Sequence, residues 1–325
     1  MIAAPELREA PVRALDLLHD ELRSGTPAVA LDRLFAVLRD VRDARSRSGW
    51  LGFVESELRH HPISAAMLED PMIRRSQEKP RGYPGDAVLL DYIYRLRDAG
   101  DATDLGRAVW DHTTATRPAA LAVQARRRIL ARSLDALTAR PAGQRRALVV
   151  ACGHFREGRL SSALRDGVLD EVVCLDSDQA SLAVVTSEWK HRPVRAVARS
   201  ATRLLGADDL GTFDLVYSAG LYDYLEAPFA RRLTSSLFDR LRTGGQLLIC
   251  NFVPQIYDAA YMESFMAWRL IYRTEAELAG LADEIPLDQR SGCTAWTDSF
   301  DAVAYLSVAR RNANATRDRA AAPAP

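Results

Sequence analysis

The residues best suited to chemistry in this sequence stand directly after two apolar, strand-like runs. The first run ends in Ala151-Cys152-Gly153-His154, and the second ends in Asp176 followed by Ser177. Ligands of α/β proteins bind where strands end at the carboxyl edge of a parallel sheet, and Gly153 would let a ligand approach the backbone closely. A carboxylate at Asp176 can accept hydrogen bonds from both hydroxyls of a ribose. The turn at Gly153 and the carboxylate of Asp176 together therefore predict a nucleoside site.

The turn at Gly153 lacks the glycine pattern typical of dinucleotide sites. The pattern G-x-G-x-x-G places a pyrophosphate on a helix N-terminus, and a ligand without phosphates needs fewer glycines there. A nicotinamide dehydrogenase is therefore disfavoured, although a tight turn in some other α/β protein remains an alternative. Asp178 follows closely after Asp176, and we interpret it as a helix cap.

Two later runs also end in small polar residues. Ser200 and Ala201 follow the third run and offer the hydroxyl and backbone amide that an adenine edge needs, as many loops would. Ser218 and Ala219 end the fourth run and would leave room for a ligand. Tyr222 and Tyr224 come next, and they either line a substrate pocket or pack against the following helix.

The pattern that positions these residues alternates strands with helices. Apolar runs at 147–152, 171–176, 194–198, 213–218 and 246–251 predict strands, with helical patterns between them. This alternation is typical of a doubly wound, mostly parallel sheet in an α/β fold. The last two runs, 291–297 and 302–309, are joined by too few residues for a helix and should pair as an antiparallel hairpin.

The region before these alternating strands and helices is predicted to be helical. Leucine spacing predicts helices through most of residues 5–139, while the proline- and glycine-rich stretch 61–86 predicts turns and loops. We therefore expect a helical lid and substrate-binding region at 1–140, a cofactor-binding domain at 141–310 and a disordered tail at 311–325.

Several segments resemble class I S-adenosylmethionine-dependent methyltransferases. The order of turn, ribose carboxylate, adenine loop, Phe213-Asp214-Leu215-Val216-Tyr217-Ser218 strand and terminal hairpin is similar to theirs. The following phrases resemble a bacterial subfamily that includes hydroxy-fatty-acid methyl ester signal synthases and natural-product methyltransferases: Lys79-Pro80-Arg81-Gly82-Tyr83-Pro84-Gly85-Asp86, Ala151-Cys152-Gly153-His154-Phe155-Arg156-Glu157, Tyr217-Ser218-Ala219-Gly220-Leu221-Tyr222-Asp223-Tyr224-Leu225, Asn251-Phe252, Tyr261-Met262-Glu263 and Ile271-Tyr272-Arg273-Thr274-Glu275. This sequence departs from the commoner pattern in having one glycine, Gly153, where many members have two or three.

The resemblance implies a Rossmann-like fold, S-adenosylmethionine as cofactor and roles for particular residues. Arg81 would pair with the methionine carboxylate or make only a surface ion pair, and Tyr83 would cover the cofactor. The following residues are candidates for cofactor contacts: Arg81, Tyr83, Ala151, Gly153, Asp176, Ser177, Ser200, Ala201, Ser218 and Ala219. Candidates for catalysis are Tyr222, Asp86, Glu263 and His154, with helix capping as the alternative for Asp86 and capping or solvent exposure for His154. Candidates for the substrate pocket are Tyr92, Tyr224, Trp268 and Tyr272, with core packing as the alternative for Trp268 and Tyr272.

Composition limits the partners. The chain of 325 residues has 43 basic and 43 acidic residues, so it lacks the positive field of a nucleic-acid binder. The arginine runs 126–128 and 145–146 are expected to form solvated faces. The scattered cysteines indicate no zinc site, and the sequence shows no signal peptide or membrane span, so we expect a metal-free cytoplasmic protein, with a homodimer compatible with the sequence.

These observations predict methyl transfer to a small, largely apolar metabolite, aromatic, indole-type or hydroxylated, in bacterial specialised metabolism. One alternative is carboxyl methylation of a hydroxy fatty acid. A carboxylate substrate would need a cationic side chain near the pocket, and Arg269 and Arg273 are the candidates that the sequence offers there. The alternative from another class is a catalytically inactive methyltransferase-like binding module.

Overall fold

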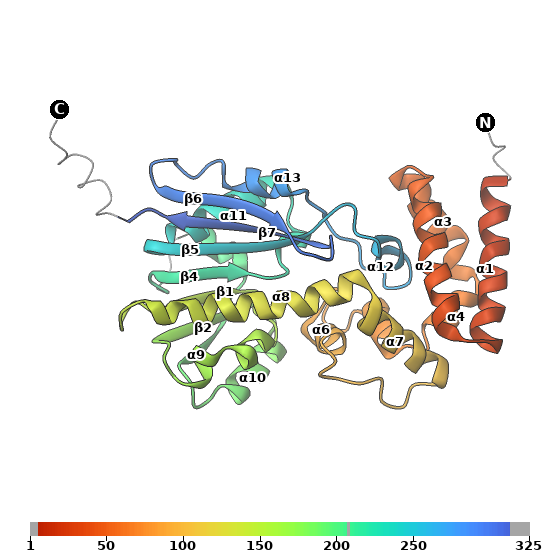
Figure 1. The fold of residues 1–325 in the computed structure, drawn as a ribbon, viewed down its shortest axis with the longest axis horizontal. Helices are drawn as coiled ribbons and strands as arrows, with labels where there is room; N and C mark the ends of the chain where they lie inside the picture. Colours follow the sequence, from red (N-terminus) through yellow and green to blue (C-terminus); the bar gives the residue numbers. More distant parts are fainter. Residues whose placement is uncertain (1–5, 207–208, 313–325) are drawn as a thin grey trace. The chain divides into compact units, whose positions relative to one another are not determined.

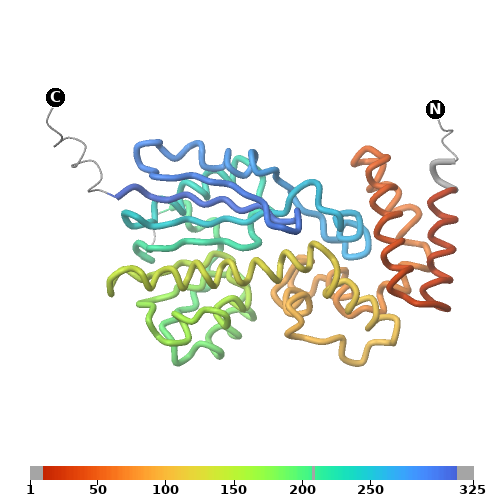
Figure 2. The backbone as a smooth tube through the Cα atoms, viewed as in Figure 1, coloured from red at the N-terminus to blue at the C-terminus, as the bar shows by residue number. Residues whose placement is uncertain are grey.

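The computed structural model describes residues 6–206 and 209–312, which divide into two compact units. Unit 1 contains the described part of residues 1–124 and residues 255–270, and unit 2 contains the described parts of 125–254 and 271–325. Figure 2 traces the chain through both units. Most of the tail predicted to be disordered, residues 313–325, lies outside the described residues. The lid role predicted for residues 1–140 stays a prediction.

Unit 1 is built from helices, as the leucine spacing predicts. The apolar face of each helix packs into the core of the unit. In α2, for example, Leu31, Leu34, Phe35 and Leu38 are buried. The helices are α1 (Glu6–Ser24), α2 (Pro27–Asp43), α3 (Arg47–Ser56), α4 (Pro62–Met67), α5 (Pro71–Glu78), α6 (Ala87–Ile93), α7 (Asp104–Thr116), the start of α8 (Pro118–Asp135) and α12 (Ala259–Ser264), with the short 3₁₀ turn η1 (Leu58–His60).

Two segments of the proline-rich stretch are helical, so our prediction of loops was wrong there. Both α4 and α5 begin with a proline, at the position where its missing N–H costs no hydrogen bond. Side chains cap both helices: His61 Nδ1 accepts the Ile63 N–H at 3.1 Å and Asp70 Oδ1 accepts the Met72 N–H at 2.7 Å. The prolines start helices here rather than end them.

Unit 2 contains a seven-stranded sheet in the order β3-β2-β1-β4-β5-β7-β6 (Figure 1). Strands β1 to β5 pair in parallel, and β7 runs antiparallel to both of its neighbours. The strands are β1 (Arg146–Val150), β2 (Glu171–Asp176), β3 (Val194–Ala198), β4 (Phe213–Ser218), β5 (Leu241–Phe252), β6 (Arg290–Thr297) and β7 (Val303–Arg310). The predicted α/β fold, with its doubly wound sheet and terminal hairpin, is confirmed.

The strand order creates a switch point between β1 and β4. From β1 the chain winds outward through β2 and β3, and it then returns to the other side of β1 as β4. At such a switch point the connections from adjacent strands leave in opposite directions, and ligands of α/β sheets bind there at the carboxyl edge. The residues that follow β1, β2 and β4 therefore share one edge.

Short helices and turns connect the strands. α10 packs on β2 and β3, α11 on β5, and α13 on β6 and β7. The central strands β1 and β4 are buried along almost their whole length, as expected for a sheet covered on both faces. The connecting elements are the end of α8, α9 (Ser162–Arg165), α10 (Gln179–Glu188), α11 (Ala227–Asp239) and α13 (Glu275–Ala279), with 3₁₀ turns η2 (Ala136–Ala139), η3 (Arg156–Leu160), η4 (Ala201–Leu205), η5 (Tyr222–Tyr224) and η6 (Gly280–Ala282).

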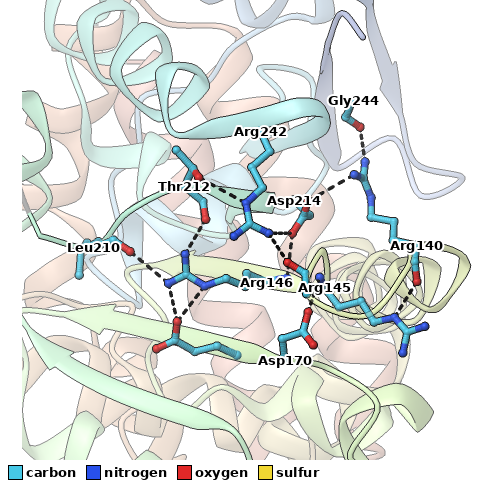
Figure 3. A network of polar contacts seen from close by, with 11 residues as sticks. Arg140, Arg145, Arg146, Asp170, Leu210, Thr212, Asp214, Arg242 and Gly244 are labelled. Atoms are coloured by element: carbon cyan, nitrogen blue, oxygen red, sulfur yellow. Dashed lines mark hydrogen bonds and ion pairs between the residues drawn. The ribbon is translucent and has the colours of Figure 1, made fainter. Parts of the chain in front are cut away.

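The amino edge of this sheet is closed by an ion-pair network (Figure 3). Asp214 at the start of β4 is 1% exposed and accepts hydrogen bonds from Arg140 at 3.3 Å, the Arg146 N–H at 3.0 Å and Arg242 at 3.1 Å. The Arg146 side chain binds Glu171 and the Thr212 carbonyl. The expectation of a plain solvated face at Arg145-Arg146 was therefore wrong, because both side chains tie strands and loops together.

No helix within the described ranges is long and apolar enough to cross a membrane.

One buried carboxylate in unit 1 is only half satisfied. Asp70 uses Oδ1 to cap α5, while Oδ2 is buried with no hydrogen-bond partner among the described residues. Burial raises the pKa of Asp70 to about 7. Ionising this side chain in the folded protein therefore costs free energy.

We expect Asp70→Asn to become more stable relative to the original protein as the pH rises. The folded pKa of Asp70 lies above the unfolded value, so its contribution to stability is present at low pH and is lost as the pH rises through about 7. Urea unfolding at about pH 5 and about pH 8 should show the difference between the two proteins growing by roughly 3 kcal/mol. A difference that does not change with pH would contradict this account.

Candidate active site at the carboxyl edge of the sheet

The turn after β1 has an unusual backbone. Ala151, Gly153 and Phe155 have φ angles of 54°, 52° and 51°. This left-handed region costs a residue with a side chain of the order of 1 kcal/mol, and such strain concentrates at functional sites. The turn therefore has three residues in the left-handed conformation, although only one of them, Gly153, is a glycine. Phe155 is held there by an edge contact with Trp189 at 5.7 Å between ring centroids.

Asp176 ties this turn to the end of β2. Its Oδ2 accepts the Gly153 N–H at 2.8 Å and its Oδ1 accepts the Asp178 N–H at 2.9 Å. A carboxylate offers about four acceptor positions, so two remain for the hydroxyls of a ribose. The side chain is buried, so a ligand bound here would be shielded from water.

The neighbouring residues divide into caps and exposed groups. Asp178 caps α10 by accepting the Ala180 N–H at 3.0 Å, as expected. Ser200 caps η4 and lies exposed after β3, next to the half-buried Ala201, while Ser177 is exposed after Asp176. Ser200 and Ala201 thus lie after β3, where the adenine is expected, and Ser177 lies after β2.

The end of β4 holds a buried arginine that the sequence pattern did not indicate. Arg126 of α8 is 2% exposed and donates to the Ala219 carbonyl at 2.7 Å. The expectation of a solvated face was wrong for Arg126, because this face of α8 packs inward. Ser218 is fully buried and donates its hydroxyl to the Val150 carbonyl at 3.1 Å, which ties the ends of β4 and β1 together.

The two tyrosines after β4 point to different environments. Tyr222 is fully buried, and its hydroxyl lies 3.1 Å from the Thr234 hydroxyl of α11. Burial raises the pKa of Tyr222, so its hydroxyl stays protonated. Tyr224 is 36% exposed. The geometry favours the packing interpretation for Tyr222 and leaves Tyr224 as the residue able to meet a substrate.

Between these tyrosines, Asp223 belongs to a polar cluster. Asp223 Oδ1 accepts the Phe252 N–H at 2.7 Å, and burial raises the pKa of Asp223 to about 7. Arg273 donates to Asn251 Oδ1 and to the Tyr222 carbonyl, both at 2.6 Å, and to the Leu225 carbonyl. Asp223 was not among the predicted site residues, although its position just after a strand that ends in small residues could have indicated it.

Two other candidates lie in unit 2. His154 is buried in the turn after β1, with Nδ1 3.4 Å from an Arg156 nitrogen, and Tyr272 is half-buried next to Arg273. Neither placement assigns a catalytic role.

The remaining candidates belong to unit 1, and their roles toward a cofactor or substrate stay predictions. Asp86 caps α6 through the Leu89 N–H at 2.8 Å and pairs with Arg75 at 2.6 Å, which favours the capping interpretation. Glu263 binds Arg42 through both oxygens and accepts the Trp50 indole N–H at 2.8 Å. Arg81 and Tyr83 are half-buried, and Tyr92 and Trp268 are buried.

We predict that Glu263 has a structural role. Glu263→Ala removes the buried partner of Arg42 and Trp50, a loss that typically costs about 3–5 kcal/mol. Glu55→Ala, which removes the exposed partner of Arg269, should cost under about 1 kcal/mol. Urea unfolding of both variants checks this, and equal small losses would leave Glu263 available for another role.

Comparisons with known proteins identify a shared fold. No protein-family model and no curated protein matches the sequence. A possible exported protein from Bordetella parapertussis is 17% identical with a TM-score of 0.54, covering 79% of this chain and 99% of that chain. This likeness shows the fold alone.

Two weaker likenesses are to methyltransferases. The N-methyltransferase NodS from Bradyrhizobium japonicum is 12% identical with a TM-score of 0.41, covering 58% of this chain and 98% of that chain. The 1,6-didemethyltoxoflavin-N1-methyltransferase from Burkholderia thailandensis is 18% identical with a TM-score of 0.41, covering 58% of this chain and 79% of that chain. Any function must therefore be argued from the residues of this chain.

Proposed function

We propose that this protein is an S-adenosylmethionine-dependent methyltransferase that acts on a small, largely apolar metabolite of bacterial specialised metabolism. The observation that carries the proposal is the Asp176 carboxylate, which is held against the left-handed turn after β1 and keeps acceptor capacity for a ribose. The sheet around it has the terminal antiparallel hairpin that the sequence resemblance implies.

The residues at this edge fit the cofactor. Asp176 would hold the ribose, Gly153 would allow close approach to the backbone, and Ser200 and Ala201 would meet the adenine. When bound, S-adenosylmethionine supplies a methyl group on an electrophilic sulfonium. The protein then needs to place the acceptor in line with that methyl group in a site from which water is excluded. The lid role predicted for residues 1–140 is part of this proposal.

The two cations named for a carboxylate substrate, Arg273 and Arg269, favour a neutral acceptor because both already have partners. Arg273 already donates to two carbonyls and to Asn251, and Arg269 pairs with Glu55 at 2.6 Å. A carboxylate acceptor would have to compete with these partners. This supports an aromatic, indole-type or hydroxylated acceptor.

Methyl transfer from labelled cofactor tests the proposal directly. The full chain is incubated with three pools: neutral indoles, phenols and alcohols; hydroxy fatty acids; and tRNA or DNA. We expect label in the neutral pool. Label in nucleic acid alone would overturn the small-molecule assignment, and cofactor binding without transfer to any pool would indicate the inactive binding module.

We predict that Asp176→Ala weakens S-adenosylmethionine binding about tenfold to a hundredfold. The substitution removes a charged acceptor for the ribose hydroxyls, and a charge-assisted hydrogen bond is worth about 1.5–3 kcal/mol. Calorimetry on the folded variant measures this.

The matched control is the same substitution two residues later. Asp178→Ala removes a helix cap and should cost about 1 kcal/mol of stability while leaving cofactor affinity within about twofold. Equal affinity losses in the two variants would contradict the ribose assignment.

A further inference from the structure

Asp223 is a buried carboxylate that the proposed function has not yet used. It is 2% exposed, and its Oδ1 accepts the Phe252 N–H at the end of β5 at 2.7 Å. The hydrogen bonds within residues 6–206 and 209–312 leave its Oδ2 unused, and this oxygen is not among their fully buried atoms that lack a partner, so it stays open to a ligand. A carboxylate that is fixed through one oxygen and open at the other can accept a hydrogen bond from a ligand.

The neighbours of Asp223 do not satisfy this oxygen. Arg126 of α8 and Arg273 after β5 are the cations that face it, and both favour its ionised form through space. Arg273 directs its donors to the Tyr222 and Leu225 carbonyls and to Asn251, and Arg126 donates to the Ala219 carbonyl. Cys250 of β5 also faces Asp223 and stays a neutral thiol, because burial raises the pKa of Cys250 to about 12.

Asp223 lies at the carboxyl edge of the sheet, across the switch point from the residues of the proposed nucleoside site. The nucleoside residues Gly153 and Asp176 follow β1 and β2, and the switch point of the sheet lies between β1 and β4. Asp223 follows β4, and its carboxylate accepts the N–H at the end of β5, on the side of the switch point away from Asp176. The exposed ring of Tyr224 is the next residue along the chain.

We propose that Asp223 is a catalytic residue that binds and deprotonates an N–H or O–H group of the acceptor. Its free oxygen accepts the hydrogen bond from that group and then takes the proton. The acceptor's nitrogen or oxygen forms a bond to the methyl carbon, the methyl–sulfur bond breaks with its electron pair staying on sulfur, and the proton passes from Asp223 to solvent. This inference rests on the proposed function.

The proposal also names the substrate class. An ionised Asp223 attracts a neutral N–H or O–H group and repels a carboxylate, and Arg273 directs its donors to two carbonyls and to Asn251. The acceptor should therefore be a neutral amine-type, indole-type or hydroxyl compound with an apolar face for Tyr224. A fatty carboxylate does not fit this position.

The test compares Asp223→Asn with Asp214→Asn in the full chain. Asparagine at 223 keeps an oxygen for the Phe252 N–H but cannot take a proton. Asp214 lies at the start of β4, at the opposite edge of the sheet, with similar burial and a fully bonded carboxylate. Both variants are checked for cofactor affinity by calorimetry with S-adenosylmethionine and for thermal stability between about pH 5 and pH 8.

We expect Asp223→Asn to lower kcat/KM toward the neutral acceptor pool by about a hundredfold or more, with cofactor affinity unchanged. In the original protein, kcat/KM should fall as the pH drops below about 7, because protonated Asp223 cannot act as a base, and this dependence should be lost in the variant. Asp214→Asn should keep the original pH profile. Independently of activity, Asp223→Asn should gain stability relative to the original protein as the pH rises toward 8, because the raised pKa of Asp223 makes its ionisation costly.

The other outcomes separate the two proposals. If Asp223→Asn keeps the rate and pH profile of the original protein, Asp223 only braces β4 against β5 and the inference is overturned. If label enters hydroxy fatty acids alone, the inference fails and the methyltransferase assignment stands. If calorimetry detects no cofactor binding, the proposed function fails and this inference fails with it.

Discussion

The hydrogen bond from the Gly153 N–H to Asp176 is the interaction on which the candidate site depends. It joins the turn after β1 to the end of β2 and fixes a carboxylate beside a backbone in the left-handed conformation. Ala151 and Phe155 tolerate that conformation at some cost, and the contact of Phe155 with Trp189 helps to hold it. Without Asp176 the turn would lose this hydrogen bond, and the proposed ribose site would lose its acceptor.

The buried carboxylates at the two edges of the sheet differ in how many hydrogen-bond partners the protein gives them. At the amino edge, Asp214 accepts hydrogen bonds from Arg140, Arg242 and a backbone N–H. These bonds join β4 to the neighbouring segments and leave the carboxylate little capacity to bind a ligand. At the carboxyl edge, Asp176 and Asp223 are each held by backbone N–H groups and keep acceptor capacity. In this sheet, the carboxylate at the amino edge is satisfied within the protein, whereas the two at the carboxyl edge keep acceptor capacity that a ligand could use.

The strands of the sheet could be predicted from the sequence, but the side chains that become buried at its carboxyl edge could not. Buried strands form continuous apolar runs, so β2 and β4 were predicted with their observed bounds. The partly exposed edge strand β3 was also predicted with its observed bounds. Local patterns do not show which side chains become buried by tertiary contacts, so Arg126 was expected to be solvated and Asp223 was missed. Proline was interpreted as a breaker at Pro62 and Pro71, where its position makes it a starter.

A crystal structure of the full chain with S-adenosylhomocysteine would test the central claim most directly. The account predicts both ribose hydroxyls within about 2.5–3.0 Å of the Asp176 carboxylate oxygens, with Gly153 against the ligand. A nucleoside bound away from the end of β2, or a ribose that makes no contact with Asp176, would contradict it.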